Sequence, residues 1–185
     1  MKKFAVLSLI QLFFATAVMA QAQIGSFYGL KLGMTVSEVR SALSSQGKTM
    51  ESKDNYYKVA SPQLGDITFE SLWLKFKDSK LYSAEFFCYL GKPAFYDDPS
   101  YDQILDIVAT RSQQYKRIFD NMRLNLVGKY GNPQIDNEEK AVWRKGRNQI
   151  SLFHRFEKNM NSSGFYDIET EVNLKYESLS DNVNY

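Results

Sequence analysis

Residues 165–177 read Phe-Tyr-Asp-Ile-Glu-Thr-Glu-Val-Asn-Leu-Lys-Tyr-Glu, and apolar and charged side chains alternate along this stretch. Successive side chains of a β-strand point to opposite faces of the sheet, so one face of this strand is apolar and the other is charged. The pattern predicts an antiparallel sheet with one face on a core and the other in water. The apolar set is Tyr166, Ile168, Val172, Leu174 and Tyr176, and the charged set is Asp167, Glu169, Glu171 and Lys175.

Five further segments have the composition of strands, with β-branched and aromatic residues bounded by turn residues. In the segment that ends at Leu90, Tyr82, Ala84, Phe86 and Cys88 are expected on its inward face. Apolar residues change phase near Glu70, where a β-bulge would reconcile them. The five segments are residues 55–59, 67–77, 81–90, 140–144 and 149–157.

Two helices are predicted between these strands. Thr35 and Glu38 have the spacing of a capping box, which predicts a helix over 36–46. Ser100 is the predicted N-cap of a long helix that runs to residue 130 and stops at Gly131-Asn-Pro. Apolar side chains recur along it in steps of three and four.

The order is helix, three strands, helix, three strands, and the predicted fold class is α+β. We expect one antiparallel sheet with both helices packed on one face. Trp73 and Trp143 each precede a basic turn and an apolar strand, and this similarity suggests two pseudo-repeats of one helix and three strands. The repeats would span residues 27–90 and 100–177, although two amphipathic hairpins can also look alike by chance.

The first twenty residues have the features of a secretory signal peptide. Lys2 and Lys3 precede a short apolar run, and small residues allow cleavage after Ala20 or Ala22. The run is too short and too interrupted for a membrane span, so no stable span is expected after cleavage. The predicted organisation is a signal peptide over 1–20, one domain over 21–180 and a tail over 181–185, in the periplasm or outside the cell.

Charge and cysteine content exclude some function classes. The chain has 23 basic and 21 acidic residues, and the leader contains two lysines and no acid, which leaves 21 of each in the exported chain. A neutral chain gives no support to nucleic-acid binding, which needs a basic surface. Cys88 is the single cysteine, so no internal disulfide can form.

Residues 27–40, Phe-Tyr-Gly-Leu-Lys-Leu-Gly-Met-Thr-Val-Ser-Glu-Val-Arg, resemble the entry to the helix-plus-sheet repeat of the β-lactamase-inhibitor-like fold, which the small outer-membrane-assembly lipoproteins share. Lys129-Tyr-Gly-Asn-Pro133, followed by Trp143, is similar to uncharacterised exported proteins of Bacteroidetes. The resemblance implies a binding or assembly module of the cell envelope. The lipid-anchor cysteine and the paired disulfides of those families are absent here, so no functional residue is transferred.

The sequence contains no catalytic, metal or cofactor motif, and we expect no cofactor. His154 alternates with Ile150 and Leu152, which is the pattern of a half-buried histidine near the end of a sheet. An alternative is an envelope hydrolase with His154 as its general base. Cys88 lies between Phe86 and Leu90 and is expected to be a buried apolar residue.

Four large aromatic side chains are expected on the outer face of the sheet, by the same alternation. Such a patch is uncommon on a soluble surface and typical of binding hot spots. We therefore expect a binding module that captures an envelope or secreted protein, or a glycan. The other half of the chain could also cover this face. The four predicted binding residues are Trp73, Phe87, Tyr89 and Phe153.

The leader prediction is testable by mass spectrometry of the protein purified from its host. The mature amino terminus is expected at Gln21 or Gln23, because small residues precede both positions. Recovery of the intact chain from the cytosol, with Met1 in place, would contradict the prediction.

Overall fold

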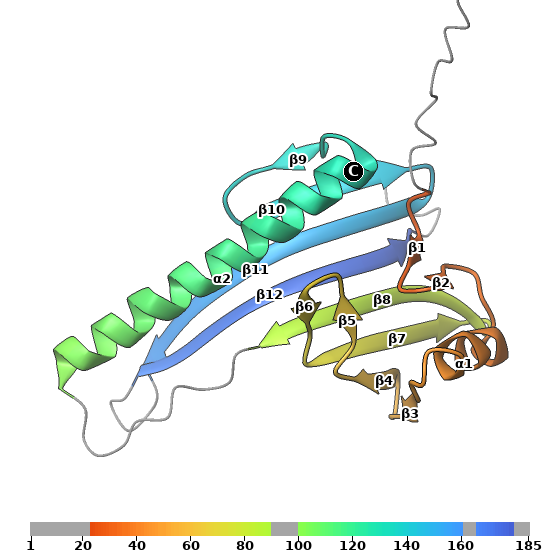
Figure 1. Cartoon of the computed structure of the whole chain (residues 1–185), viewed down its shortest axis with the longest axis horizontal. Coiled ribbons are helices and arrows are strands. Elements are labelled where there is room, and N and C mark those ends of the chain that lie inside the picture. Colours follow the sequence, from red (N-terminus) through yellow and green to blue (C-terminus); the bar gives the residue numbers. More distant parts are fainter. Residues whose placement is uncertain (1–22, 90–99, 161–165, 180–185) are drawn as a thin grey trace, which may run out of the picture.

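The computed structural model describes residues 23–89, 100–160 and 166–179. It contains an eight-stranded antiparallel sheet, two helices and two small hairpins, which confirms the α+β class (Figure 1). The predicted leader, the segment 90–99 and the tail lie outside the described residues. The helices are α1 (Val36–Ser44) and α2 (Tyr101–Tyr130), and the strands are β1 (Ser26–Phe27), β2 (Leu30–Lys31), β3 (Glu51–Ser52), β4 (Tyr57–Ala60), β5 (Gln63–Leu64), β6 (Ile67–Thr68), β7 (Ser71–Lys77), β8 (Lys80–Tyr89), β9 (Ile135–Asp136), β10 (Lys140–Lys145), β11 (Asn148–Met160) and β12 (Tyr166–Ser178).

The last strand in the sequence lies inside the sheet, whose order is β3-β4-β7-β8-β12-β11-β10-β9. Strand β12 pairs with β8 on one side and with β11 on the other. On the inner face of the sheet, one row of apolar side chains crosses six strands, and each of these side chains is at most 1% exposed. This row forms the centre of the core. Its members are Ala141, Leu152, Leu174, Phe86, Leu72 and Val59.

Helix α2 covers the inner face of the sheet over β11 and β12 (Figure 1). Its Ser100 cap accepts from the Gln103 amide, and Gln103 accepts in return from the Ser100 amide, as predicted. The helix ends at Gly131, whose carbonyl accepts a 2.7 Å hydrogen bond from the Trp143 indole. The residues that α2 buries follow the predicted three-and-four spacing, and they are Tyr115, Phe119, Met122, Leu126 and Tyr130.

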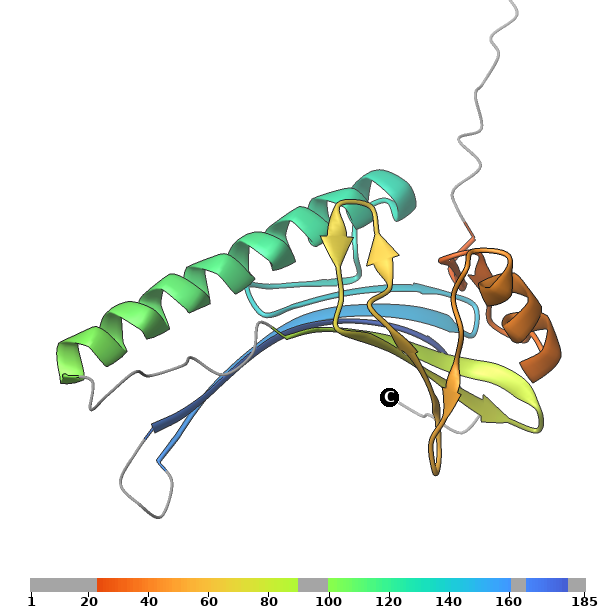
Figure 2. The ribbon, with the colours of Figure 1, turned by 60° about the horizontal axis from the view of Figure 1, so that its bottom comes forward.

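Helix α1 begins at the capping box that Thr35 and Glu38 form, also as predicted. Its buried residues Val39 and Leu43 join the same apolar core as α2. Figure 2 shows the sheet as an arch with both helices on its convex side. No helix of the described residues lies on the concave side.

The segment between β4 and β7 differs from prediction. Residues 67–77 were expected to form one strand with a bulge near Glu70. Instead the chain leaves the main sheet, forms the β5–β6 hairpin and returns at Ser71. Across this return Phe69 and Leu72 both lie in the core, and Glu70 and Ser71 both lie opposite Phe87, because the Glu70 amide donates to the Phe87 carbonyl and Ser71 pairs with Phe87.

The pairing of β7 with β8 shifts by one residue between Lys75 and Phe76, since Lys75 pairs with Ser83 and Phe76 pairs with Leu81. A one-residue shift moves side chains to the opposite face of a sheet. Leu81 is consequently buried, while Tyr82, which was expected to point inward, is 37% exposed. The strands β3 and β9 were also not predicted, because two-residue strands are too short to show alternation.

The core description predicts different costs for the same substitution at two leucines. Leu174 is 1% exposed and Leu124 is 64% exposed. Leu174→Ala should reduce the free energy of unfolding by about 2–5 kcal/mol, because it leaves a cavity in the inner row. Leu124→Ala should change it by less than about 0.5 kcal/mol. Urea unfolding of both variants measures the difference, and equal losses would contradict this core.

Candidate functional site

The uncovered face is the concave sheet face that points away from α1 and α2 (Figure 2). Three of the four predicted binding residues, Trp73, Phe87 and Phe153, lie on this face and are half-buried. One cross-strand row on it contains Phe153, Asn173, Phe87 and Ser71. The next row contains Ser151, Lys175, Glu85, Trp73 and Lys58.

Trp73 is the centre of an aromatic stack on the uncovered face. The centre of its ring lies 4.4 Å from that of the Tyr56 ring, and the two ring planes are nearly parallel. The centre of the Phe87 ring lies 4.3 Å away, with the ring planes tilted by 44°. Tyr56 was not among the predicted binding residues, although it lies two positions before Lys58, which pairs with Trp73 across the strands. That two-residue spacing was the signal in the sequence.

The other two predicted residues lie apart from the stack. Phe153 lies in the same cross-strand row as Phe87, with Asn173 between them. Tyr89 is the last residue of β8, and its backbone pairs with Glu171. The side chain of Tyr89 lies outside the described part of the chain. The sequence thus predicted the correct face for the three residues that can be placed.

Within the described residues, two buried polar atoms on the uncovered face have no hydrogen-bond partner: Trp73 Nε1 and Asn173 Oδ1. Asn173 is only 2% exposed, because Phe153 and Phe87 flank it in its row. An unsatisfied buried polar atom costs about 1–3 kcal/mol. A partner that shifted the flanking rings and supplied one donor and one acceptor would recover part of that cost.

Charged residues of both signs surround the aromatic stack. Glu85 pairs across the strands with both Trp73 and Lys175. Burial raises the pKa of the Glu85 carboxyl, and the positive charges of Lys175 and Lys75 oppose this effect. Lys175 itself forms a 2.6 Å ion pair with Glu177. The stack therefore borders a half-buried carboxylate.

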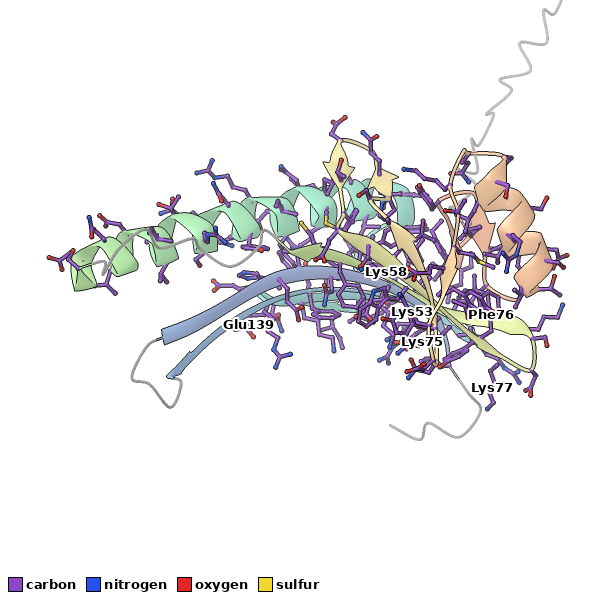
Figure 3. All side chains as sticks on the ribbon, turned by 90° about the horizontal axis from the view of Figure 1, so that it is seen from below. Lys53, Lys58, Lys75, Phe76, Lys77 and Glu139 are labelled. Carbon is purple, nitrogen blue, oxygen red and sulfur yellow. The ribbon has the colours of Figure 1, made fainter. Side chains whose placement is uncertain are left out.

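Lysines predominate where the sheet ends at β3, β4 and β7. Figure 3 shows Lys53, Lys58, Lys75 and Lys77 at this edge, and we call these four lysines the basic edge. Lys53 pairs with Glu51 at 2.5 Å. Lys58 and Lys75 lie on the same face as Trp73, so positive charge borders the aromatic stack on this side.

One family profile, described as the TP0088 domain, matches residues 25–177. The match covers most of the chain, including both helices and the whole sheet. The chain belongs to the TP0088 domain family. Comparisons with curated proteins and with solved structures found no match.

In this TP0088 domain, His154 lies on the opposite face from the stack, against α2. The centre of its ring lies 6.4 Å from the centre of the Tyr115 ring, on which it stacks, and 6.3 Å from the centre of the Phe119 ring. The buried Nε2 atom finds no hydrogen-bond partner in the part of the chain that the structure describes. Burial lowers the pKa of His154, and Lys116 lowers it further, whereas Glu139 and Asp120 oppose the shift. A general base also needs a nucleophile and an orienting group within hydrogen-bond reach, and the described contacts of this ring are aromatic.

Cys88 is buried on the inner face, as predicted. It lies two strands from His154, with Val172 between them, so about 9–10 Å separates the two backbones. Burial raises the pKa of the Cys88 thiol, which disfavours the reactive thiolate. Within the described residues, no group of His, Cys, Asp and Glu side chains could hold a metal ion.

The position of His154 predicts a pH dependence of stability. Its pKa in the folded protein is below the ordinary value of 6.5, so the unfolded chain binds more protons once the pH falls through 6.5. Stability should therefore be lost on acidification through this range, whereas neutral His154 carries no such cost above it. The free energy of unfolding of His154→Gln should change less than that of the wild type between about pH 8 and about pH 5.

Because His154 is the only histidine, its ring-proton NMR signals give its pKa directly. A titration midpoint below 6.5 is expected. A midpoint at or above 6.5, or equal pH dependence in the wild type and the variant, would contradict the buried placement against α2.

Proposed function

We propose that this TP0088 domain is an exported, non-enzymatic module that binds a protein partner on the uncovered face. The observation that carries the proposal is the presence of half-buried Trp73, Phe87 and Phe153 on a face that no described helix covers. Aromatic side chains near the centre of a surface are the residues that dominate protein–protein binding energy. The role in the cell envelope follows the resemblance of residues 27–40 to exported assembly proteins.

The geometry of the stack favours a protein partner over a glycan. Sugars bind on open ring faces, but Tyr56, from the β4 side of β7, and Phe87, from β8 on its other side, both pack against the Trp73 ring. What remains accessible is the ring edges of the stack and Phe153, and the buried Asn173 amide lies between Phe87 and Phe153. Aliphatic and aromatic side chains of a protein fit such a surface, and its backbone supplies both donors and acceptors for Trp73 and Asn173.

Charge complementarity further narrows the partner. Lys58 and Lys75 border the stack on the uncovered face, and Lys53 and Lys77 extend this positive charge along the basic edge. A partner with an apolar centre and an acidic rim on the corresponding side would complement both features. Rim charges of this kind mainly affect the association rate and its salt dependence.

Export is part of the proposal and depends on the predicted signal peptide. Within the described residues, no helix has both the length and the apolarity to cross a bilayer. A periplasmic or secreted location would place the uncovered face among other envelope or secreted proteins. The partner would be one of these.

We also propose that the domain consists of two pseudo-repeats that meet at β8 and β12. The order β4-β7-β8 in one half mirrors β10-β11-β12 in the other, and each trio follows a helix in the sequence. In this mirrored order β7 corresponds to β11. The sequence similarity around Trp73 and Trp143 had instead matched β7 with β10, because these strands contain the two tryptophans. The two tryptophans also face opposite ways, since Trp143 is buried in the core and Trp73 lies on the uncovered face. Only the symmetry of the sheet supports the duplication.

Site-specific photo-cross-linking tests the binding proposal. A photoreactive amino acid replaces Phe153 in the full chain, which is expressed in its native host. A covalent adduct with a second envelope protein is expected. A glycan adduct would show that the partner class is wrong, and the absence of any adduct would contradict the proposal. The same amino acid at Leu124, which is exposed on α2, is the control and should give no such adduct.

The partner that cross-linking identifies then allows a direct measurement of affinity. Phe153→Ser should weaken binding at least tenfold, about 1.4 kcal/mol, because it removes an anchor from the uncovered face. Phe153 forms no ring contact with the other described aromatic residues, so the melting temperature should change little. Leu124→Ser is the matched control. Unchanged affinity of Phe153→Ser would contradict the assignment of this face.

A further inference from the structure

A cavity of about 350 Å³ lies on the helix side of the sheet, separate from the uncovered face. The β5–β6 hairpin covers it on one side and α2 on another, and Figures 1 and 2 show this hairpin beside α2. The volume lies at the lower end of the range for small-molecule sites, about 300–1,000 Å³. Its apolar walls include Leu64, Ile67, Phe69, Met122, Leu126 and Leu174.

Two polar side chains of the cavity lining come from α2. Asn125 and Lys129 belong to the lining, are exposed, and are one turn apart on α2. Lys129 is the one charged residue of the lining, and its ammonium lies 5.0 Å from the centre of the Tyr130 ring. The cavity therefore combines an apolar interior with a single positive charge and an amide at its opening.

The β5–β6 hairpin is suited to act as a flap over this cavity. Its backbone hydrogen bonds close its own base, with Phe69 N–H donating to the Pro62 carbonyl at 2.9 Å and Ser61 N–H to the Glu70 carbonyl at 3.1 Å. Toward the core it presents the partly buried apolar side chains of Leu64 and Ile67. The Glu70 amide ties this base to β8 by donating to the Phe87 carbonyl at 2.9 Å, whereas the tip contacts the core through apolar side chains and can therefore shift to admit a ligand.

We infer that this cavity binds a small amphipathic carboxylate, of the fatty-acid class, with its apolar chain among Met122, Leu126 and Leu174. The carboxylate lies at the opening, where Lys129 neutralises it and the Asn125 amide donates a hydrogen bond. Each buried methylene contributes about 0.8 kcal/mol, so affinity comes mainly from the chain. Lys129 adds a preference for an anionic head over a neutral one.

Calorimetric titration of the full exported chain tests the inference, with decanoate, decan-1-ol and decyltrimethylammonium as probes. Decanoate should bind more tightly than decanol by about two- to fivefold, the range of an exposed ion pair, and the cationic probe should bind most weakly. Lys129→Gln should abolish the difference between decanoate and decanol. Lys116→Gln, an exposed lysine elsewhere on α2, is the control and should preserve that difference.

Filling the cavity distinguishes this site from binding elsewhere. Met122→Trp should abolish binding of all three probes. If that variant fails to fold, Ile67→Trp on the partly exposed hairpin replaces it, with the same expected result. Binding that survives a folded cavity-filled variant, equal loss of the head-group preference in Lys116→Gln, or no binding by the wild type would overturn the inference. None of these outcomes affects the partner proposed for the uncovered face.

Discussion

The alternation of β12 is the constraint on which the rest of the fold depends. Val172, Leu174 and Tyr176 are at most 2% exposed, and the alternate positions carry Glu171, Asn173, Lys175 and Glu177. A one-residue slip of this strand would put charged side chains into the core on both sides, because β12 pairs with β8 and β11. The cost of that slip sets the register of the two halves of the sheet. It also determines which face the helices cover and which face stays open.

The features that the sequence predicted correctly have periodic or local signals. The two capping boxes, the long helix and the inward-facing positions of Phe86 and Leu174 each follow from residue spacing alone. The β5–β6 hairpin was missed because Ser61-Pro-Gln-Leu-Gly65 has the composition of a loop, and its strands are two residues long. Tyr82 was misplaced because a register shift near Phe76 leaves no mark in the alternation of a single strand.

The candidate sites divide in the same way. Alternation predicted the face of Trp73, Phe87 and Phe153, since a face is a property of one strand. The stack with Tyr56 and the unpartnered Asn173 depend on which strands become neighbours, and a single sequence does not specify that. The cavity beside Lys129 was invisible for the same reason, because its walls come from a hairpin, a helix and a strand that are distant in the chain.

The two faces of the sheet thus have different roles in this account. The inner face is closed by α1 and α2 and holds the core, with His154 and Cys88 in contact with it. The uncovered face concentrates aromatic, unsatisfied polar and charged groups that a stable scaffold does not require. Sequence conservation is not needed for this distinction, because burial and register already separate the two sets of residues.

The central claim is that the uncovered face is open in the free protein, and tryptophan fluorescence quenching tests it most directly. The chain has two tryptophans, so Trp143→Phe leaves only Trp73 and Trp73→Phe leaves only Trp143. In the full chain, acrylamide should quench half-buried Trp73 more strongly than Trp143, which is 1% exposed. Equal and weak quenching of both would mean that the concave face is covered, and would contradict the account.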